Sequence, residues 1–325
     1  MSIFVERKNY KPFEYHKITD PLINAMWAGH WTHNEFTFKS DVHDFKTVLT
    51  PEEREVITRA ILMISQVEVS VKSYWSNIGK LLPKPEIADM GAVFGGVEVI
   101  HSRAYSEILA KLKMEKRFEE LLGEEVIQNR TEYLRKYVNK IYKNDHKNIL
   151  YSLVLFTLFT ENVSLFSQFY LILGFNRFQN ILKDISNVVA YTSKEEGNHA
   201  QGGTALINVI TKEHPELFDD EFQNKIIEEV QEALLSERKI VQWILQGYQN
   251  DFITEEILME YIKGRMNTSL KDIGIKFQFP INKELIEKTT WMDEEIFGSA
   301  MVDFFNKKPI DYTKKQKSFE ANELF

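Results

Sequence analysis

The sequence of 325 residues predicts an all-α protein built around a deep core. Two observations lead to this prediction. The eight prolines stand at positions 12, 21, 51, 83, 85, 215, 280 and 309, so residues 86–214 contain none, and so long a stretch without proline favours helices over strands and tight turns. Hydrophobic residues make up 43% of the chain and aromatic residues 13%, which is enough for a large buried interior.

We expect helices at residues 51–81, 86–113, 123–143, 145–173, 176–211, 220–249 and 253–272. The first of them begins at a clear signal, because Thr50 can act as N-cap, Pro51 suits the first helical position and Glu53 completes a capping box. Together these helices predict one helical domain over residues 50–305.

Two terminal segments lack helical periodicity. Residues 1–49 are rich in aromatic side chains and are expected to pack as an irregular N-terminal arm. Residues 306–325 are polar and rich in lysine, which is typical of a flexible C-terminal tail.

Charge and cysteine content exclude several classes of function. The formal net charge is −8 and no basic run occurs, so nucleic-acid binding is not expected. The chain has no cysteine, which rules out disulfides, thiolate zinc sites and a cysteine nucleophile. The composition suits a reducing cytoplasm, and the N-terminal residues lack the apolar core of a signal peptide.

One apolar segment, residues 149–175, is long enough to cross a bilayer and contains a single charge, at Glu161. Glu161, Asn162 and Gln168 lie near its middle, where each would be costly in lipid. We therefore interpret the segment as a core helix and expect no membrane association.

Two Glu-x-x-His pairs occur, Glu98 with His101 and Glu196 with His199. On a helix, residues i and i+3 share a face, so the carboxylate and the imidazole of each pair point to one place. One such pair means little by itself, because glutamate is common. The context of the two pairs makes the pattern specific.

Each pair follows a lone glutamate in an apolar helix. Glu68 is the only charge between Ala60 and Val71 and stands 30 residues before the first pair, and Glu161 stands 35 residues before the second. Spacings of this length fit two consecutive antiparallel helices, so all six side chains could meet between four helices. The alternative is a set of buried residues satisfied by salt bridges.

Buried carboxylates need compensation, and two divalent cations would supply it. Oxygen donors combined with imidazole suit iron or manganese. One glutamate from each of two helices and Glu-x-x-His from each of two others is the ligand pattern of ferritin-like dimetal carboxylate bundles. We therefore expect a ferritin-like helical bundle with a dinuclear metal site in its core. Its ligands would be Glu68, Glu98, His101, Glu161, Glu196 and His199.

The residues around the first pair resemble a known family. Glu98-Val-Ile-His101-Ser102-Arg103-Ala104-Tyr105 is similar to the Glu-x-x-His-Ser-Arg-x-Tyr signature of class I ribonucleotide reductase small subunits. The resemblance extends to Glu161 with its following aromatics and to Glu195-Glu196-Gly-Asn-His199, and covers roughly Pro51 to His199. It implies a homodimeric, radical-generating subunit of ribonucleoside-diphosphate reductase, which acts on ribonucleotides only with a large catalytic subunit.

In that family the position of Tyr105 carries a stored tyrosyl radical. Tyr105 follows His101 by four residues, so it lies on the metal-facing side of its helix. However, Glu68 stands where most members with this radical have Asp, and Leu165 stands where many relatives have Phe, although Phe169 is retained. These departures resemble subclasses in which the metal cluster itself stores the oxidant. The resemblance favours two manganese ions and leaves manganese–iron and two iron ions open.

The resemblance also implies a route by which the radical leaves the site. Trp31 would connect through Glu195, in place of the usual Asp, to a metal-bound histidine, with Trp27 as the less favoured tryptophan. Tyr312 in the tail would continue the route. The terminal apolar residues would dock the tail on the large subunit; they are Phe319, Leu324 and Phe325.

Lys72 lies one turn after Glu68 on the same helix face, where a cation could draw an anionic oxidant such as superoxide towards the metals. An ordinary solvated lysine is the simpler interpretation. Two other functions fit the ligand set. They are a stand-alone dimetal ligand-binding oxidase of related fold and a ferritin-like storage protein. A self-contained oxidase has no use for Tyr312 and an apolar terminus, and a storage protein would normally be far shorter and would not need Trp31, Glu195 and Tyr105 in register.

Overall fold

The computed structural model describes residues 2–138 and 145–297, and the regular elements in these ranges are helices. The elements are α1 (His16–Ala28), α2 (Lys39–His43), the π-helix η1 (Asp44–Val48), α3 (Pro51–Leu81), α4 (Pro85–Leu112), α5 (Glu115–Leu121), α6 (Glu125–Val138), α7 (His146–Leu155), the π-helix η2 (Phe156–Ser164), α8 (Phe166–Gln179), α9 (Lys183–Glu213), the 3-10 helix η3 (Pro215–Leu217), α10 (Asp220–Leu245), α11 (Glu255–Asp272), α12 (Lys283–Glu287) and α13 (Thr290–Phe297).

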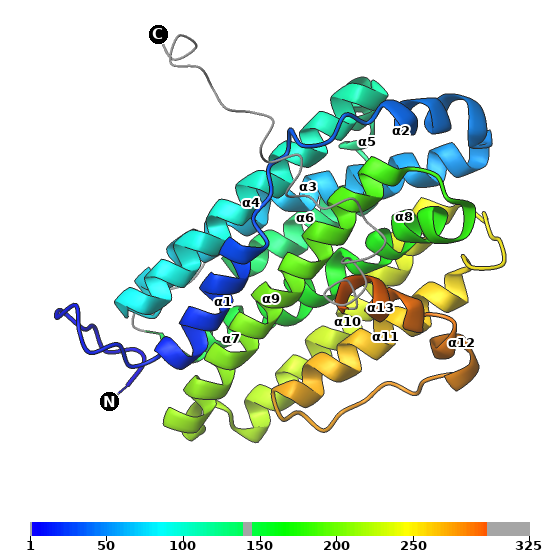
Figure 1. The fold of residues 1–325 in the computed structure, drawn as a ribbon. Coiled ribbons are helices and arrows are strands. Elements are labelled where there is room, and N and C mark those ends of the chain that lie inside the picture. The colour runs from blue at the N-terminus through cyan, green and yellow to red at the C-terminus, as the bar shows by residue number, and fades with distance from the viewer. Residues whose placement is uncertain (1, 139–144, 298–325) are drawn as a thin grey trace, which may run out of the picture.

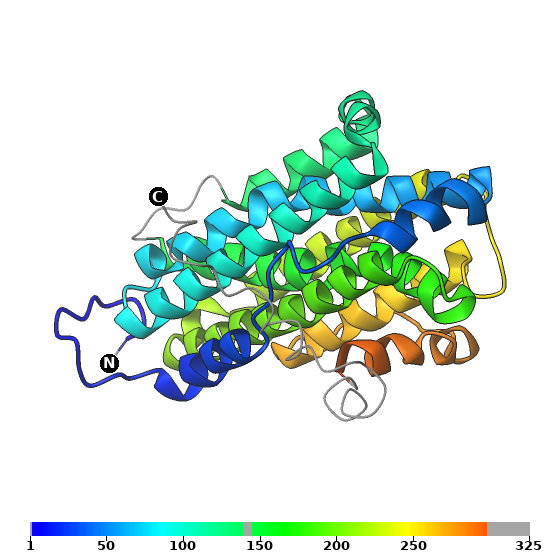
Figure 2. The same cartoon turned by 45° about the horizontal axis from the view of Figure 1, so that its top comes forward.

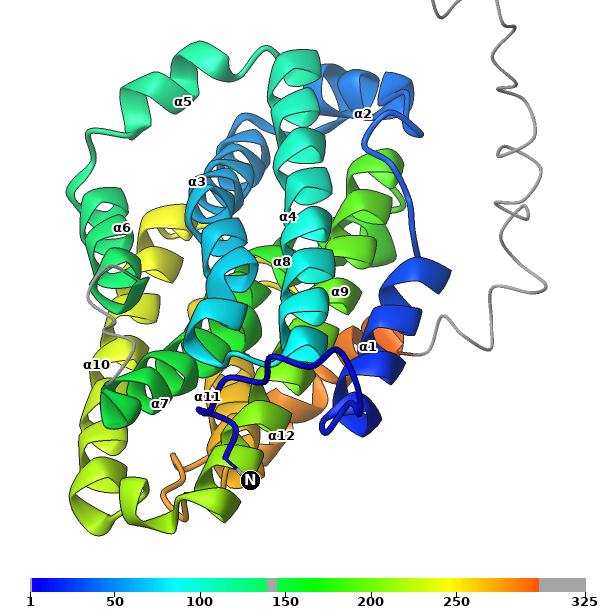
Figure 3. The ribbon, with the colours of Figure 1, turned by 90° about the vertical axis from the view of Figure 1, so that its left-hand side faces the viewer.

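The long helices α3, α4, α9, α10 and α11 run side by side along one axis (Figures 1 and 2). Helix α1 packs on α4 and α9, and α5 spans the distance between the ends of α4 and α6 (Figure 3). The predicted all-helical, ferritin-like bundle is confirmed.

Close contact between α3 and α4 depends on glycine. A Cβ atom at Gly91 would lie 2.4 Å from the carbonyl oxygen of Trp75, and one at Gly79 would lie 2.5 Å from the Cβ of Ala88. Only glycine leaves room for the two backbones to approach this closely. The predicted start of α3 is also found, since Thr50 and Glu53 form a capping box.

The expected single helix over residues 145–173 is wrong in its interior. The chain is α-helical in α7, widens to a π-helix over Phe156–Ser164 and returns to α-helix in α8. The helix expected to begin at residue 176 begins instead at Lys183, because Asn180 and Leu182 adopt φ values of 57° and 56°. A residue in the left-handed region ends a helix.

The irregular arm expected over residues 1–49 is wrong where α1, α2 and η1 form. In α1, Leu22, Ile23 and Met26 are buried. This apolar stripe is short, so the helical period did not stand out in the aromatic-rich sequence of residues 1–49. The tail at residues 306–325 lies outside the described residues. The apolar segment His146–Gln179 is long enough to span a membrane, but 89% of its most apolar window is buried inside the protein.

Candidate metal centre

Four elements bring the six predicted ligands together in the core. Their side chains are at most 1% exposed. Two overlapping groups have ligand atoms within 4.8 Å of one another: Glu68, Glu98, His101 and Glu196 in the first, and Glu98, Glu161, Glu196 and His199 in the second. We call these groups site A and site B.

The two shared glutamates face both histidines. Glu98 directs Oε2 to Nδ1 of His101 at 3.2 Å and Oε1 to Nδ1 of His199 at 3.0 Å. Glu196 directs Oε1 to Nδ1 of His101 at 3.3 Å and Oε2 to Nδ1 of His199 at 3.1 Å. Each carboxylate thus has one oxygen for each site, as a carboxylate that bridges two cations requires.

The other two glutamates are terminal, one at each site. Glu68 Oε2 lies 3.9 Å from Nδ1 of His101, and Glu161 Oε2 lies 3.6 Å from Nδ1 of His199. Burial raises the pKa of both carboxyls well above the usual range. Burial acts in the same direction on Glu196, but hydrogen bonds from Glu161, His101 and His199 prevail and lower its pKa.

Burial alone would lower the pKa of the two histidines. Hydrogen bonds to the surrounding carboxylates outweigh it, so the pKa of His101 and that of His199 lie well above the usual value. Protons therefore occupy this centre when no cation does.

The donor set fits two divalent cations. Both oxygens of the buried Glu68 carboxylate have no hydrogen-bond partner among the described residues. Such groups are costly unless paired or bound to a metal. Four carboxylates and two imidazoles around two adjacent sites give a dinuclear centre of the kind that iron and manganese occupy.

A hydrogen-bonded chain leads away from site A. Nε2 of His101 lies 2.7 Å from Oε2 of Glu195, and Nε1 of Trp31 donates to the same oxygen at 3.0 Å. Trp31 is 2% exposed, whereas Trp27 is 65% exposed, so of these two tryptophans Trp31 is the one next to site A. In contrast, Nε2 of His199 has no hydrogen-bond partner among the described residues.

Tyr105 is buried beside site A. Burial, followed by the Glu68 carboxylate, raises the pKa of its phenol above the ordinary value of 10.0, so the side chain is neutral. Leu165 and Phe169 are also buried. Lys72 is partly buried, and its Nζ lies 3.4 Å from Oγ of Ser102 on α4.

The sequence reasoning missed Trp75, which is fully buried on α3. Its Nε1 donates to Oε1 of Glu161 at 2.6 Å, and its ring centroid lies 5.9 Å from that of His199. A signal was available, because Trp75 follows Glu68 by seven residues, or two helical turns, and so shares its face. Each site thus has its own buried tryptophan.

Comparisons with known proteins agree with this geometry. The family model described as ribonucleotide reductase, small chain, matches residues 7–288. Two viral proteins assigned as ribonucleoside-diphosphate reductase small subunits are similar to this chain. The protein of Invertebrate iridescent virus 6 is 25% identical, and the match covers 96% of this chain and 95% of that protein. The protein of Invertebrate iridescent virus 3 is 23% identical, and the match covers 97% of this chain and 86% of that protein.

Solved structures share the fold. The ribonucleotide reductase R2 subunit from Clostridium botulinum gives a TM-score of 0.76 at 18% identity, covering 91% of this chain and 92% of that one. Dimanganese(II) NrdF from Streptococcus sanguinis gives a TM-score of 0.73 at 13% identity, and the match covers 87% of this chain and 99% of that one. An R2-like ligand-binding oxidase with a Mn/Fe cofactor gives a TM-score of 0.68 at 15% identity, and the match covers 81% of this chain and 96% of that one. The family match over most of the chain, together with the buried centre, shows that this protein belongs to the ribonucleotide reductase small-subunit family.

Proposed function

We propose that this ribonucleoside-diphosphate reductase small subunit holds two manganese ions in sites A and B and passes an oxidising equivalent from site A through Glu195 and Trp31 to its large subunit. The observation that supports the route is the shared Oε2 of Glu195, which contacts both His101 and Trp31. Within the described ranges Nε2 of His199 has no hydrogen-bond partner, which supports site A, rather than site B, as the point of exit.

The six ligands would hold the cations as the two overlapping groups do, with Glu98 and Glu196 shared. An oxidised metal pair supplies a strong one-electron oxidant. Glu195 then has two tasks: it fixes the ring of His101 through Nε2, and it accepts the indole N–H of Trp31. Because an indole that loses an electron becomes a stronger acid, this carboxylate is placed to hold the proton while the electron moves.

Manganese is favoured over iron by Glu68 at the first ligand position and by Leu165 in the surrounding shell. Related folds have been solved with a dimanganese(II) centre and with a Mn/Fe cofactor. The chain's own donors suit both metals, so loading experiments must decide. Tyr105 is close enough to site A to feel the charge of Glu68 and is the alternative store of the radical.

The partner side of the proposal rests on the tail. Tyr312 would relay the radical, and Phe319, Leu324 and Phe325 would dock on the large subunit, with the small subunit working as a homodimer. These four residues lie outside the described residues. The chain contains no cysteine, so the substrate-reducing thiols that the family uses must belong to the large subunit.

Low-temperature electron paramagnetic resonance tests the proposal. Protein loaded with manganese and exposed to oxidant should give a many-line signal from a coupled, high-valent manganese pair. A sharp radical signal that disappears in Tyr105→Phe would make Tyr105 the store instead. A signal only after iron loading would replace manganese by iron, and no signal with either metal would refute the radical-generating role.

A further inference from the structure

The π-helix η2 carries Glu161, and two arginines from other helices donate to its last turn. Nε of Arg265 on α11 donates to the carbonyl oxygen of Asn162 at 2.6 Å, and its Nη2 donates to Oδ1 of the same residue. Nη2 of Arg130 on α6 donates to the carbonyl oxygen of Ser164 at 2.5 Å. The two acceptor residues, Asn162 and Ser164, lie within three residues of Glu161.

A π-helix needs such support. Its hydrogen bonds run from residue i to i+5, and the chain must return to the i to i+4 pattern where α8 begins at Phe166. Carbonyl groups at a change of helical register lose their regular donors and need others, because an unpaired buried carbonyl is costly. A guanidinium can satisfy two acceptors in one plane, which is how Arg265 holds both oxygens of Asn162.

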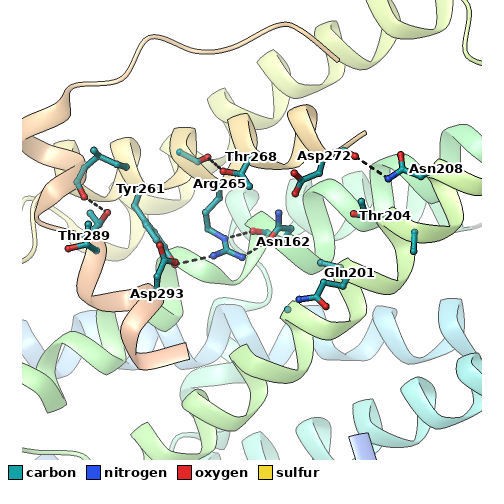
Figure 4. Close-up of a pocket in the computed structure, with 16 residues that line it drawn as sticks. Asn162, Gln201, Thr204, Asn208, Tyr261, Arg265, Thr268, Asp272, Thr289 and Asp293 are labelled. Atoms are coloured by element: carbon teal, nitrogen blue, oxygen red, sulfur yellow. Dashed lines mark hydrogen bonds between the residues drawn. The ribbon is translucent and has the colours of Figure 1, made fainter. Parts of the chain in front are cut away.

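Both arginines are themselves held in place. The guanidinium of Arg265 lies over the ring of Phe166, 3.3 Å from its centroid, and within 3.4 Å of the hydroxyl of Tyr261. It borders a cavity of about 650 Å³ lined by residues of α9, α11, α12 and α13, into which Asn162 also projects (Figure 4). Arg130 is 2% exposed and forms a buried ion pair with Glu237.

We propose that Arg265 and Arg130 are positioning residues that clamp the last turn of η2 and so keep the carboxylate of Glu161 directed at site B. The inference rests on the proposed dinuclear function, since it concerns the affinity of one of the two sites. The effect of the clamp on the two sites is selective, because Glu161 belongs to site B and not to site A. Loosening the clamp should weaken site B and leave site A intact.

The test is a manganese(II) titration of the full-length protein and of Arg265→Lys and Arg265→Met. Total bound metal is measured by equilibrium dialysis, and electron paramagnetic resonance separates isolated ions from coupled pairs. Removing a group that hydrogen-bonds a metal ligand directly typically lowers affinity by about 10- to 100-fold. Arg265 acts on Glu161 only through Asn162, so the lower end of that range, about 10-fold, applies. We expect a loss of that size at site B in Arg265→Met, so that one isolated ion per chain replaces the coupled pair. Arg265→Lys, which keeps one donor, should retain part of the affinity of site B that Arg265→Met loses.

Arg130 needs a double variant, because removing it alone would leave Glu237 buried without its partner. Arg130→Met combined with Glu237→Met removes both charges and should show the same selective loss at site B. If that protein does not fold, the Arg265 series decides by itself.

Arg59 offers a matched control. Its Nη1 donates to the carbonyl oxygen of Trp243 at 2.6 Å, and its guanidinium lies 4.8 Å from the centroid of that ring, so the contact resembles that of Arg265 but holds α10. Arg59→Met should lower the melting temperature and keep two manganese ions.

Three outcomes would overturn the clamp. These are two ions bound by Arg265→Met with wild-type affinity, equal weakening of both sites, and the same metal loss in Arg59→Met. Failure of the wild-type chain to bind two ions would instead refute the dinuclear centre on which the clamp depends.

Discussion

Binding of manganese should release protons from the centre, and the affinity should rise steeply with pH. In the metal-free protein, burial raises the pKa of Glu68 and Glu161, and hydrogen bonds to the surrounding carboxylates raise the pKa of His101 and His199, so these groups keep protons to higher pH than they would in the unfolded chain. A carboxylate must be ionised, and Nδ1 of each imidazole must be free, before it can bind a cation. Protons should therefore leave when two ions enter.

The magnitude follows from linkage. Each displaced proton makes binding tighter by about 1.4 kcal/mol, or about tenfold, per pH unit. The stability of the metal-free protein should change in the opposite direction. Folded-state pKa values raised above the ordinary 4.5 of Glu68 and 6.5 of His101 stabilise the fold at low pH, and this contribution is lost as pH rises through the raised values.

Calorimetric titrations with manganese in buffers of different ionisation enthalpy, between pH 6 and 8, measure the released protons directly. Glu68→Gln supplies a control, because it removes one titrating group and one ligand of site A while preserving side-chain size. It should release fewer protons and bind one ion. An affinity that is the same at both ends of the pH range, with heats independent of buffer, would refute the conclusion that the metal-free centre holds protons.

Four further changes test single contacts. Trp75→Phe removes the donor to Glu161 and should weaken manganese binding at site B by about tenfold in a metal titration, and an unchanged affinity would exclude a role for that hydrogen bond. Glu195→Gln should keep both metals but lower turnover with the large subunit by about 100-fold, since an amide cannot hold the proton of Trp31; normal turnover would argue against this route. Lys72→Met should slow activation by an anionic oxidant, and unchanged activation kinetics would reduce Lys72 to a packing residue. Deleting residues 306–325 should abolish turnover with the large subunit while the metal content stays normal, and loss of metal would contradict a purely docking role for the tail.

Helical segments and the six residues of the candidate centre could be predicted from sequence because local patterns reveal both. Glu98 and His101 share a helix face at i and i+3 whatever surrounds them. Lone charges such as Glu68 and Glu161 in apolar helices signal a buried partner, since an isolated carboxylate does not remain charged in a core. The choice of Trp31 over Trp27, in contrast, came from the family resemblance and was supported only when the side chains were seen.

The sequence by itself therefore determined that the protein is helical and which six side chains meet in its core. The tertiary structure decided which carboxylates are shared between the sites and that η2 is π-helical. It also showed that Trp75 donates to Glu161 and that Arg265 and Arg130 donate to Asn162 and Ser164 in the turn that follows it. The physical reason is distance along the chain. Arg265 lies 103 residues from Asn162, and the packing of α11 against η2, rather than any periodicity, brings the two together.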